Sequence, residues 1–255
     1  MNEQQKQWLK EYQREMPKLL AQWKADGNVY AEGENDRADV FISDGIAVPE
    51  LWFNQEVRPL IVLKEAYDTS EAHEDWDELE WFITGGHKQG KISSKTWCML
   101  SRWASYLFTE KYGLYDKDVS QGWDNPCLQH IALINVKKYG GHSQSSDADL
   151  RRHVAAHYEY IYRQIELNRP TIVICGNTGW LLDLVWTKMF GESIRGEHNS
   201  TWVYDVPHLA VPAKMLDYWH PSNLRCTVQD SYACIDRLFE NAGKPVEANE
   251  GRDDD

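Results

Sequence analysis

The chain has 255 residues, of which 42% are hydrophobic and 12% aromatic, and its formal net charge is −13. This composition is typical of one large globular domain, and the acidity disfavours a protein that coats nucleic acid through bulk electrostatics. Much of the negative charge lies in residues 71–80 and in the C-terminal tail, so a local basic groove is compatible with the rest of the chain.

The first predicted element is an amphipathic helix over residues 3 to about 25, where apolar side chains recur at helical spacing. Four short, continuous apolar runs follow, at residues 59–68, 130–141, 169–179 and 209–222, and a hairpin strand at 201–206 precedes the last. Helical patterns lie at about 95–111, 147–168, 179–190 and 228–241. Apolar runs without alternation are typical of strands buried on both faces, as in parallel sheets covered by helices.

The alternation of these runs with helical patterns predicts an α/β fold. We expect a three-layer sandwich in which helices flank a central, mainly parallel, four-stranded sheet. Residues 1–245 would form this single domain, with the first helix as an N-terminal extension, and residues 246–255 an acidic disordered tail. Such folds bind ligands at the carboxyl ends of their strands, where this chain carries KEAYDT, NVKKYGG, GNTG and YWHPSNLR.

The sequence also excludes several classes of site. No apolar run approaches the roughly 20 residues of a membrane-spanning helix, and the polar N-terminus is unlike a signal peptide, so we expect a cytoplasmic protein with no membrane partner. The five cysteines are scattered and form no CxxC pair, which argues against a disulfide framework and against a zinc or iron–sulfur site. We therefore expect no metal and no cofactor, and a monomer.

The order and spacing of three strand ends resemble the uracil-DNA glycosylase superfamily. The corresponding residues are Glu65 to Asp68 at the first strand end, Asn135 at the second and His220 to Arg225 at the last. The resemblance is to the branch whose first motif reads Gly-Glu-Ala-Pro-Gly, and it extends to INVKKYGG and RPTIVICG. Lys64 and Tyr67 replace a glycine and the proline of that motif, and the iron–sulfur cysteines of the branch are missing, which points away from uracil as the substrate.

The resemblance implies a monofunctional DNA glycosylase. Such an enzyme flips a damaged or modified base out of DNA and hydrolyses its N-glycosidic bond, leaving an abasic site. Some members of the superfamily act in antiviral defence, so glucosylated hydroxymethylcytosine of phage DNA is a candidate substrate. The alternative is a non-catalytic module on the same fold that binds nucleic acid or another protein, which would explain the acidity.

Three residues are the catalytic candidates that the resemblance implies. Glu65, or Asp68 three residues on, would stabilise positive charge on the deoxyribose and orient water, although either carboxylate could instead cap a helix or pair with Lys64. His220 would donate a hydrogen bond to a base oxygen that becomes anionic. A helix beginning after Pro221 and Ser222 would add its N–H groups, whereas a histidine bonded inside a turn is the structural alternative.

The remaining candidates would bind the nucleotide. Asn135 would read the edge of the flipped base or else fix a loop, and Tyr67 would stack on the base or else pack in the core. Ser222 and Asn223 complete the predicted base-binding set. Three cationic residues would contact DNA phosphates or else form a solvated charged surface; they are Lys137, Lys138 and Arg225.

Overall fold

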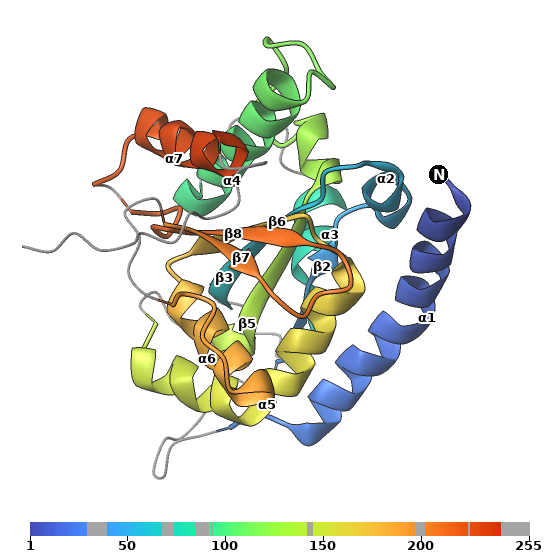
Figure 1. Cartoon of the computed structure of the whole chain (residues 1–255), viewed down its shortest axis with the longest axis vertical. Helices are drawn as coiled ribbons and strands as arrows, with labels where there is room; N and C mark the ends of the chain where they lie inside the picture. The colour runs from blue at the N-terminus through green and yellow to red at the C-terminus, as the bar shows by residue number, and fades with distance from the viewer. Residues whose placement is uncertain are drawn as a thin grey trace, which may run out of the picture.

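The computed structural model describes residues 1–29, 40–67, 74–84, 92, 94–141, 145–196, 202–223 and 225–240, with the backbone alone at residues 67, 83 and 84. Within these ranges the chain forms a central sheet between two layers of helices (Figure 1). The predicted acidic tail and Asp68 lie outside the described residues. No helix in the described ranges is long and apolar enough to cross a bilayer.

The central sheet has six strands in the order β2-β5-β3-β6-β8-β7. The four inner strands run parallel and are the four predicted apolar runs: β5 (Ala132–Gly141), β3 (Pro59–Tyr67), β6 (Ile172–Gly176) and β8 (Ala213–Tyr218). The edge strands β2 (Gly45–Ile46) and β7 (Val203–Val206) pair antiparallel with β5 and β8. The α/β class and the mainly parallel sheet are therefore confirmed. The prediction of four strands was wrong for two reasons. With two residues, β2 is too short to show an alternation of apolar and polar side chains, and the expected hairpin strand, β7, joins the central sheet.

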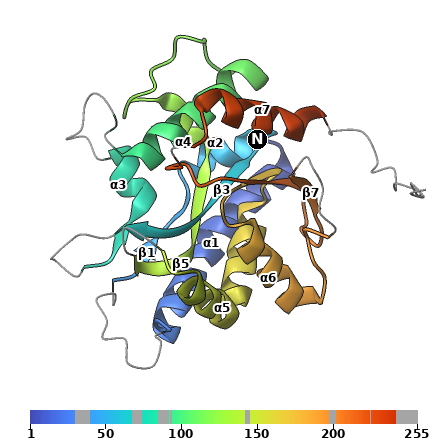
Figure 2. The same ribbon diagram turned by 90° about the vertical axis from the view of Figure 1, so that its left-hand side faces the viewer.

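Helices cover both faces of the sheet, as the views in Figure 1 and Figure 2 agree. One face packs against α5 (Asp147–Asn168), α6 (Gly179–Phe190), α1 (Glu3–Asp26) and the short α2 (Pro49–Asn54). The other packs against α3 (Glu78–Thr84), α4 (Lys95–Ser105), the π-helical turn at Tyr106–Lys111, the 3₁₀ turn at Pro126–His130 and α7 (Val228–Glu240). A parallel pair of two-residue strands, β1 (Ile42–Ser43) and β4 (Trp76–Asp77), lies beyond the carboxyl end of β3.

The predicted opening helix is α1, and local signals set both of its ends. The Asn2 side chain accepts from the backbone N–H of Gln5, whose own side chain accepts from the backbone N–H of Asn2. Gly27, with φ of 79°, ends the helix. Buried Tyr12 and Trp23 join α1 to the core shared with α5 and α6, so the helix is an integral layer and not an extension of the domain.

Candidate active site

The ends of three parallel strands pack tightly against one another. Gly176 ends β6, and a Cβ there would lie 2.6 Å from Leu63 Cδ2 of β3 and 3.0 Å from Pro221 Cδ of the loop after β8. Only glycine leaves room for this approach. The loop that follows β8 is therefore held against β3 and β6 at the edge where the site is predicted.

His220 stands in this loop, half-buried, with a defined hydrogen-bond pattern. Its Nδ1 accepts from the backbone N–H of Ser222 at 3.2 Å and lies 2.8 Å from the Ser222 hydroxyl. Burial, and then the charge of nearby Lys64, lower the pKa of His220 to about 4. A backbone N–H can only donate, so Nδ1 is the acceptor and the neutral ring carries its proton on Nε2. The imidazole is therefore a neutral hydrogen-bond donor.

The loop after His220 is a tight turn and not the start of a helix. Asn223 donates its backbone N–H to the His220 carbonyl at 2.8 Å, and its side-chain oxygen accepts from the Arg225 backbone at 3.0 Å. The helix begins at Val228, behind a reciprocal cap between Thr227 and Asp230. The expectation of a helix that begins after Pro221 and Ser222 was wrong: the Ser222 N–H donates to the His220 ring, and the helix begins only at Val228.

Glu65 belongs to a largely buried ion-pair cluster. Its carboxylate lies 3.2 Å from Lys137 Nζ, which also lies 2.7 Å from Asp149 of α5, and the side chains of Glu65 and Lys137 are only 4% and 8% exposed. A Cβ at Gly141 would lie 2.3 Å from the Glu65 Cδ, so the backbone of β5 closes over the carboxylate. Burial alone would lower the pKa of Lys137, but the hydrogen bond to Asp149 and the charge of Glu65 raise it. Glu65 thus pairs with Lys137 rather than with Lys64.

Asn135 and Lys138 lie in a second, fully buried polar cluster around Asp44, which directly precedes β2. Lys138 Nζ lies 2.5 Å from Asp44 Oδ1, and both side chains have no exposed surface. The other Asp44 oxygen accepts from the Asn135 backbone at 2.7 Å and from its Nδ2 at 3.3 Å. Gln164 of α5 donates to Asp44 at 2.9 Å.

Glu78, at the start of α3, faces the same asparagine. Its Oε2 accepts from Asn135 Nδ2 at 2.6 Å. Burial, and then the charge of Asp44, raise the pKa of Glu78 to about 8. Two carboxylate oxygens at Nδ2 fix the orientation of the Asn135 amide. Its Oδ1 is buried and has no hydrogen-bond partner among the described residues.

These contacts correct the predicted phosphate-binding set. Lys138 is enclosed with Asp44 and cannot reach a phosphate, and Lys137 is committed to two carboxylates. Arg225 is exposed. Of the three predicted phosphate contacts, only Arg225 is thus exposed and without a carboxylate partner among the described residues.

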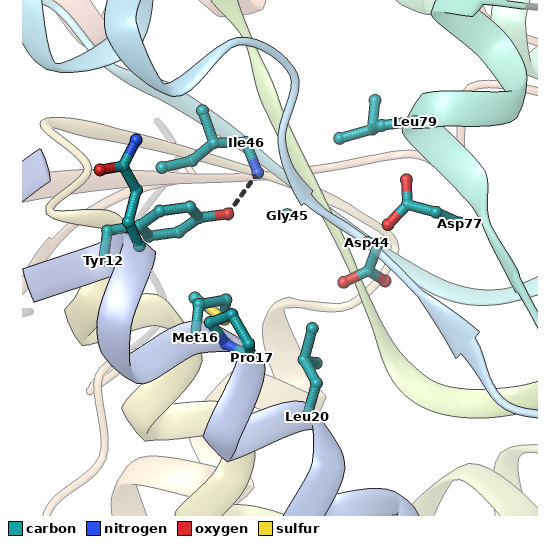
Figure 3. A pocket seen from close by; sticks show the side chains of 10 residues that line it. Tyr12, Met16, Pro17, Leu20, Asp44, Gly45, Ile46, Asp77 and Leu79 are labelled. Atoms are coloured by element: carbon teal, nitrogen blue, oxygen red, sulfur yellow. Dashed lines mark hydrogen bonds between the residues drawn. The ribbon is translucent and has the colours of Figure 1, made fainter. Parts of the chain in front are cut away.

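A separate pocket of about 380 Å³ lies between α1 and β2 (Figure 3). Its polar groups are used within the protein: the Tyr12 hydroxyl accepts from the Ile46 backbone at 3.1 Å, and Asp77 accepts from Ser43 at 2.8 Å. Its remaining walls are mostly apolar. None of the predicted site residues lines it, although Asp44, which binds Asn135 and Lys138, is one of its lining residues.

The structure thus places the predicted residues in three groups. His220, Ser222 and Asn223 form one turn, Glu65 and Lys137 one ion pair, and Asn135 and Lys138 one buried cluster. The side chain of Tyr67 and all of Asp68 lie outside the described part.

Sequence reasoning missed three carboxylates that complete these groups, Asp44, Glu78 and Asp149. Asp44 carries the clearest signal, since it interrupts the apolar stretch VFISDGIAV.

No model of a known protein family matches this chain, and no curated protein matches it either.

Proposed function

We propose that this protein is a monofunctional DNA glycosylase. The observation that carries the proposal is the state of His220: a neutral imidazole with its proton on Nε2, held by Ser222 at the carboxyl edge of a parallel sheet. Open α/β sheets bind their ligands at this edge. A fixed neutral donor suits a reaction in which negative charge develops on a departing group.

In the proposed reaction, water replaces the base at C1′ of the deoxyribose. The bonding electrons leave with the base, so the base becomes anionic while the sugar becomes cationic. Water then adds to C1′ and gives up one proton to the sugar-side carboxylate, and one proton from solvent converts the departed base to its neutral form. The Nε2–H of His220 hydrogen-bonds to a base oxygen, and this bond strengthens as negative charge grows on that oxygen. Because the pKa of His220 is about 4, the residue acts as a hydrogen-bond donor at neutral pH and not as a source of a proton.

Asn135 supports a base-binding role through its unpaired oxygen. A buried acceptor without a partner costs free energy, on the order of 1–3 kcal/mol. Asn135 is only 2% exposed, so an N–H group on the edge of a flipped base would reach and satisfy this oxygen only once the residues that cover the cluster have moved. The Nδ2 group is already engaged by Glu78 and Asp44, so we assign base reading to Oδ1 alone. Tyr67 would stack on the same base.

The sugar-side carboxylate would be Asp68 or Glu65. Glu65 is charge-paired with Lys137 and covered by β5, which leaves little of its carboxylate for a sugar or a water molecule. The enclosure favours Asp68 for this role and gives Glu65 the task of holding Lys137 and the end of β3 in place. The proposed reaction uses no metal and no cofactor.

The test is base release from defined DNA. The purified protein is incubated with duplexes and single strands that contain uracil or glucosylated hydroxymethylcytosine, and the products are treated with alkali to break the strand at abasic sites. We expect strand breaks at the modified base, with glucosylated hydroxymethylcytosine preferred to uracil. The absence of breaks on all of these substrates would count against a glycosylase acting on them.

The second candidate function is a non-catalytic binding module on the same fold. One observation favours it: the Glu65 carboxylate is neutralised by Lys137, so the residue that matches the motif lacks a free charge. In the same experiment this module would retain DNA in a gel-shift assay and leave every substrate intact after alkali. Binding without breaks would therefore support the module.

A further inference from the structure

A hollow of about 440 Å³ lies in the loop that carries His220, and its lining includes Trp219, Asn223, Arg225 and Cys226. Its volume falls within the range of about 300–1,000 Å³ that is typical of small-ligand pockets. The lining combines an aromatic ring, a guanidinium and an amide. The hollow is separate from the buried cluster around Asn135.

Trp219 is exposed and lies against a second tryptophan ring. It is 47% exposed, although an indole ring is usually largely buried. Trp202 meets the Trp219 ring edge-on, at a centroid distance of 6.4 Å and an angle of 84°. The residue directly follows β8, and the following turn is tied back to the His220 carbonyl. An aromatic ring is thus presented directly after the end of a core strand.

Arg225 supplies a cation to the same hollow. Its backbone is bound by the Asn223 side chain at 3.0 Å, and its side chain has no carboxylate partner within the described part of the chain. On a chain of net charge −13, a guanidinium without an acidic partner is available to an external anion.

An aromatic surface next to a cation is the arrangement that binds single-stranded nucleic acid, because bases stack on the ring while phosphates meet the charge. We infer that this hollow binds one unpaired nucleotide adjacent to the flipped base, with Trp219 stacked on the base and Arg225 on the phosphate. The inference rests on the proposed function, since the nucleotide flanks the one held by His220. It implies a preference for single-stranded or locally melted DNA.

The test measures binding to a labelled oligothymidylate, as a single strand and as a duplex with oligoadenylate, by fluorescence anisotropy. Neither probe contains a base to be excised, so the readout is independent of base release. We expect tighter binding of the single strand. Trp219→Ala should weaken that binding by about tenfold, as expected for the loss of one base-stacking contact, while Trp219→Phe should retain most of it.

Arg225 is tested in the same assay through its salt dependence. Arg225→Ala should weaken binding and reduce the slope of log affinity against log salt by about one unit, whereas Arg225→Lys should keep the slope. The matched controls are Leu114→Ala, which removes another exposed apolar side chain, and Arg14→Ala, which removes an exposed cation on α1. Melting temperatures of all variants establish that they are folded.

Different outcomes separate this inference from the proposed function. Equal binding of both probes, no binding of either, or unchanged single-strand affinity in Trp219→Ala would overturn the inference, even if base release is observed. Single-strand binding that depends on Trp219, together with no base release from any substrate, would uphold the inference and count against the glycosylase. Weak binding by both Trp219→Ala and Trp219→Phe, with both variants folded, would contradict stacking as the source of affinity.

Discussion

His220 is the residue on which the proposed chemistry depends most directly. Because its hydrogen bond strengthens only as the base becomes anionic, His220→Ala should slow base release by about 10² to 10³ while changing DNA affinity little. Single-turnover rates and binding constants on the same substrate measure the two effects. His208→Asn is the control, since His208 pairs with Glu192 and belongs to none of the three groups described above. A wild-type rate in His220→Ala would make the histidine a structural part of its turn.

The two candidate carboxylates differ in their surroundings, and conservative amides separate them. Asp68→Asn should lower the rate of base release by at least about 10², because it removes a charge that the sugar cation needs. Glu65→Gln should instead lower the melting temperature and slow release less than tenfold, since it breaks the pair with Lys137. The reverse pattern would identify Glu65 as the sugar-side carboxylate despite its enclosure.

Glu78 makes stability depend on pH at the alkaline side. Its pKa is raised from an ordinary 4.5 to about 8, so between these values the folded state holds a proton that the unfolded state has lost. The stability that this proton supplies is fully present below about pH 4.5 and is lost as the pH rises through 8. Glu78→Gln should therefore be more stable than the wild type at pH 9, by on the order of 5 kcal/mol, and melt at a higher temperature there, whereas the two should match near pH 4.5. Equal melting temperatures at pH 9 would contradict a buried, protonated Glu78.

At the scale of elements, the Asp44–Lys138 pair ties the segment before β2 to β5, and Gln164 adds α5. Lys138→Met should cost about 3–5 kcal/mol, because it leaves the Asp44 charge buried and unpaired. The double variant Asp44→Asn with Lys138→Met should recover much of that loss. Chemical denaturation measures the stabilities. Unaltered DNA affinity of folded Lys138→Met would accord with a lysine that does not reach phosphate.

The inner strands could be predicted from the sequence, and much of the polar clustering could not. Residues 59–67 and 132–141 read as continuous apolar runs because helices cover both faces of the sheet. In contrast, β2 has only two residues, which is too few to show a hydrophobic pattern. Lys137 and Lys138 look like a surface pair in KKYGG. Only the fold brings Asp44 to Lys138 from 94 residues away, and no local pattern encodes such a pairing.

His220 could be predicted as a candidate, but its state could not. The motif HPSNLR marks the residue, whereas its tautomer depends on whether the Ser222 N–H points at the ring or into a helix. The backbone forms a turn at residues 220–223, and in this turn the Ser222 N–H points at the His220 ring. Likewise Asn135 was predicted as a base reader, yet which of its two side-chain atoms faces a ligand depends on Glu78, which approaches from another element.

For the whole molecule, the negative net charge limits how the protein can bind DNA. Its net charge of −13 repels phosphates at long range, while the burial of Lys138 and the pairing of Lys137 leave Arg225 as the exposed cation of the predicted set. Association should therefore be slow and favoured by a short contact region rather than by a broad basic face. Stacking and base reading would supply the rest of the affinity.

The salt dependence of DNA binding tests this picture. Each phosphate contact contributes about 0.7–0.9 to the slope of log affinity against log salt, so a protein with few contacts should show a slope of about 1 to 3. Affinity should fall between about 50 and 200 mM salt, but by much less than the 10³ to 10⁵ of proteins that contact many phosphates. Fluorescence anisotropy titrations over this range measure the slope. A slope near zero would exclude Arg225 as a phosphate contact, and a much steeper one would require phosphate contacts from cations outside the predicted set.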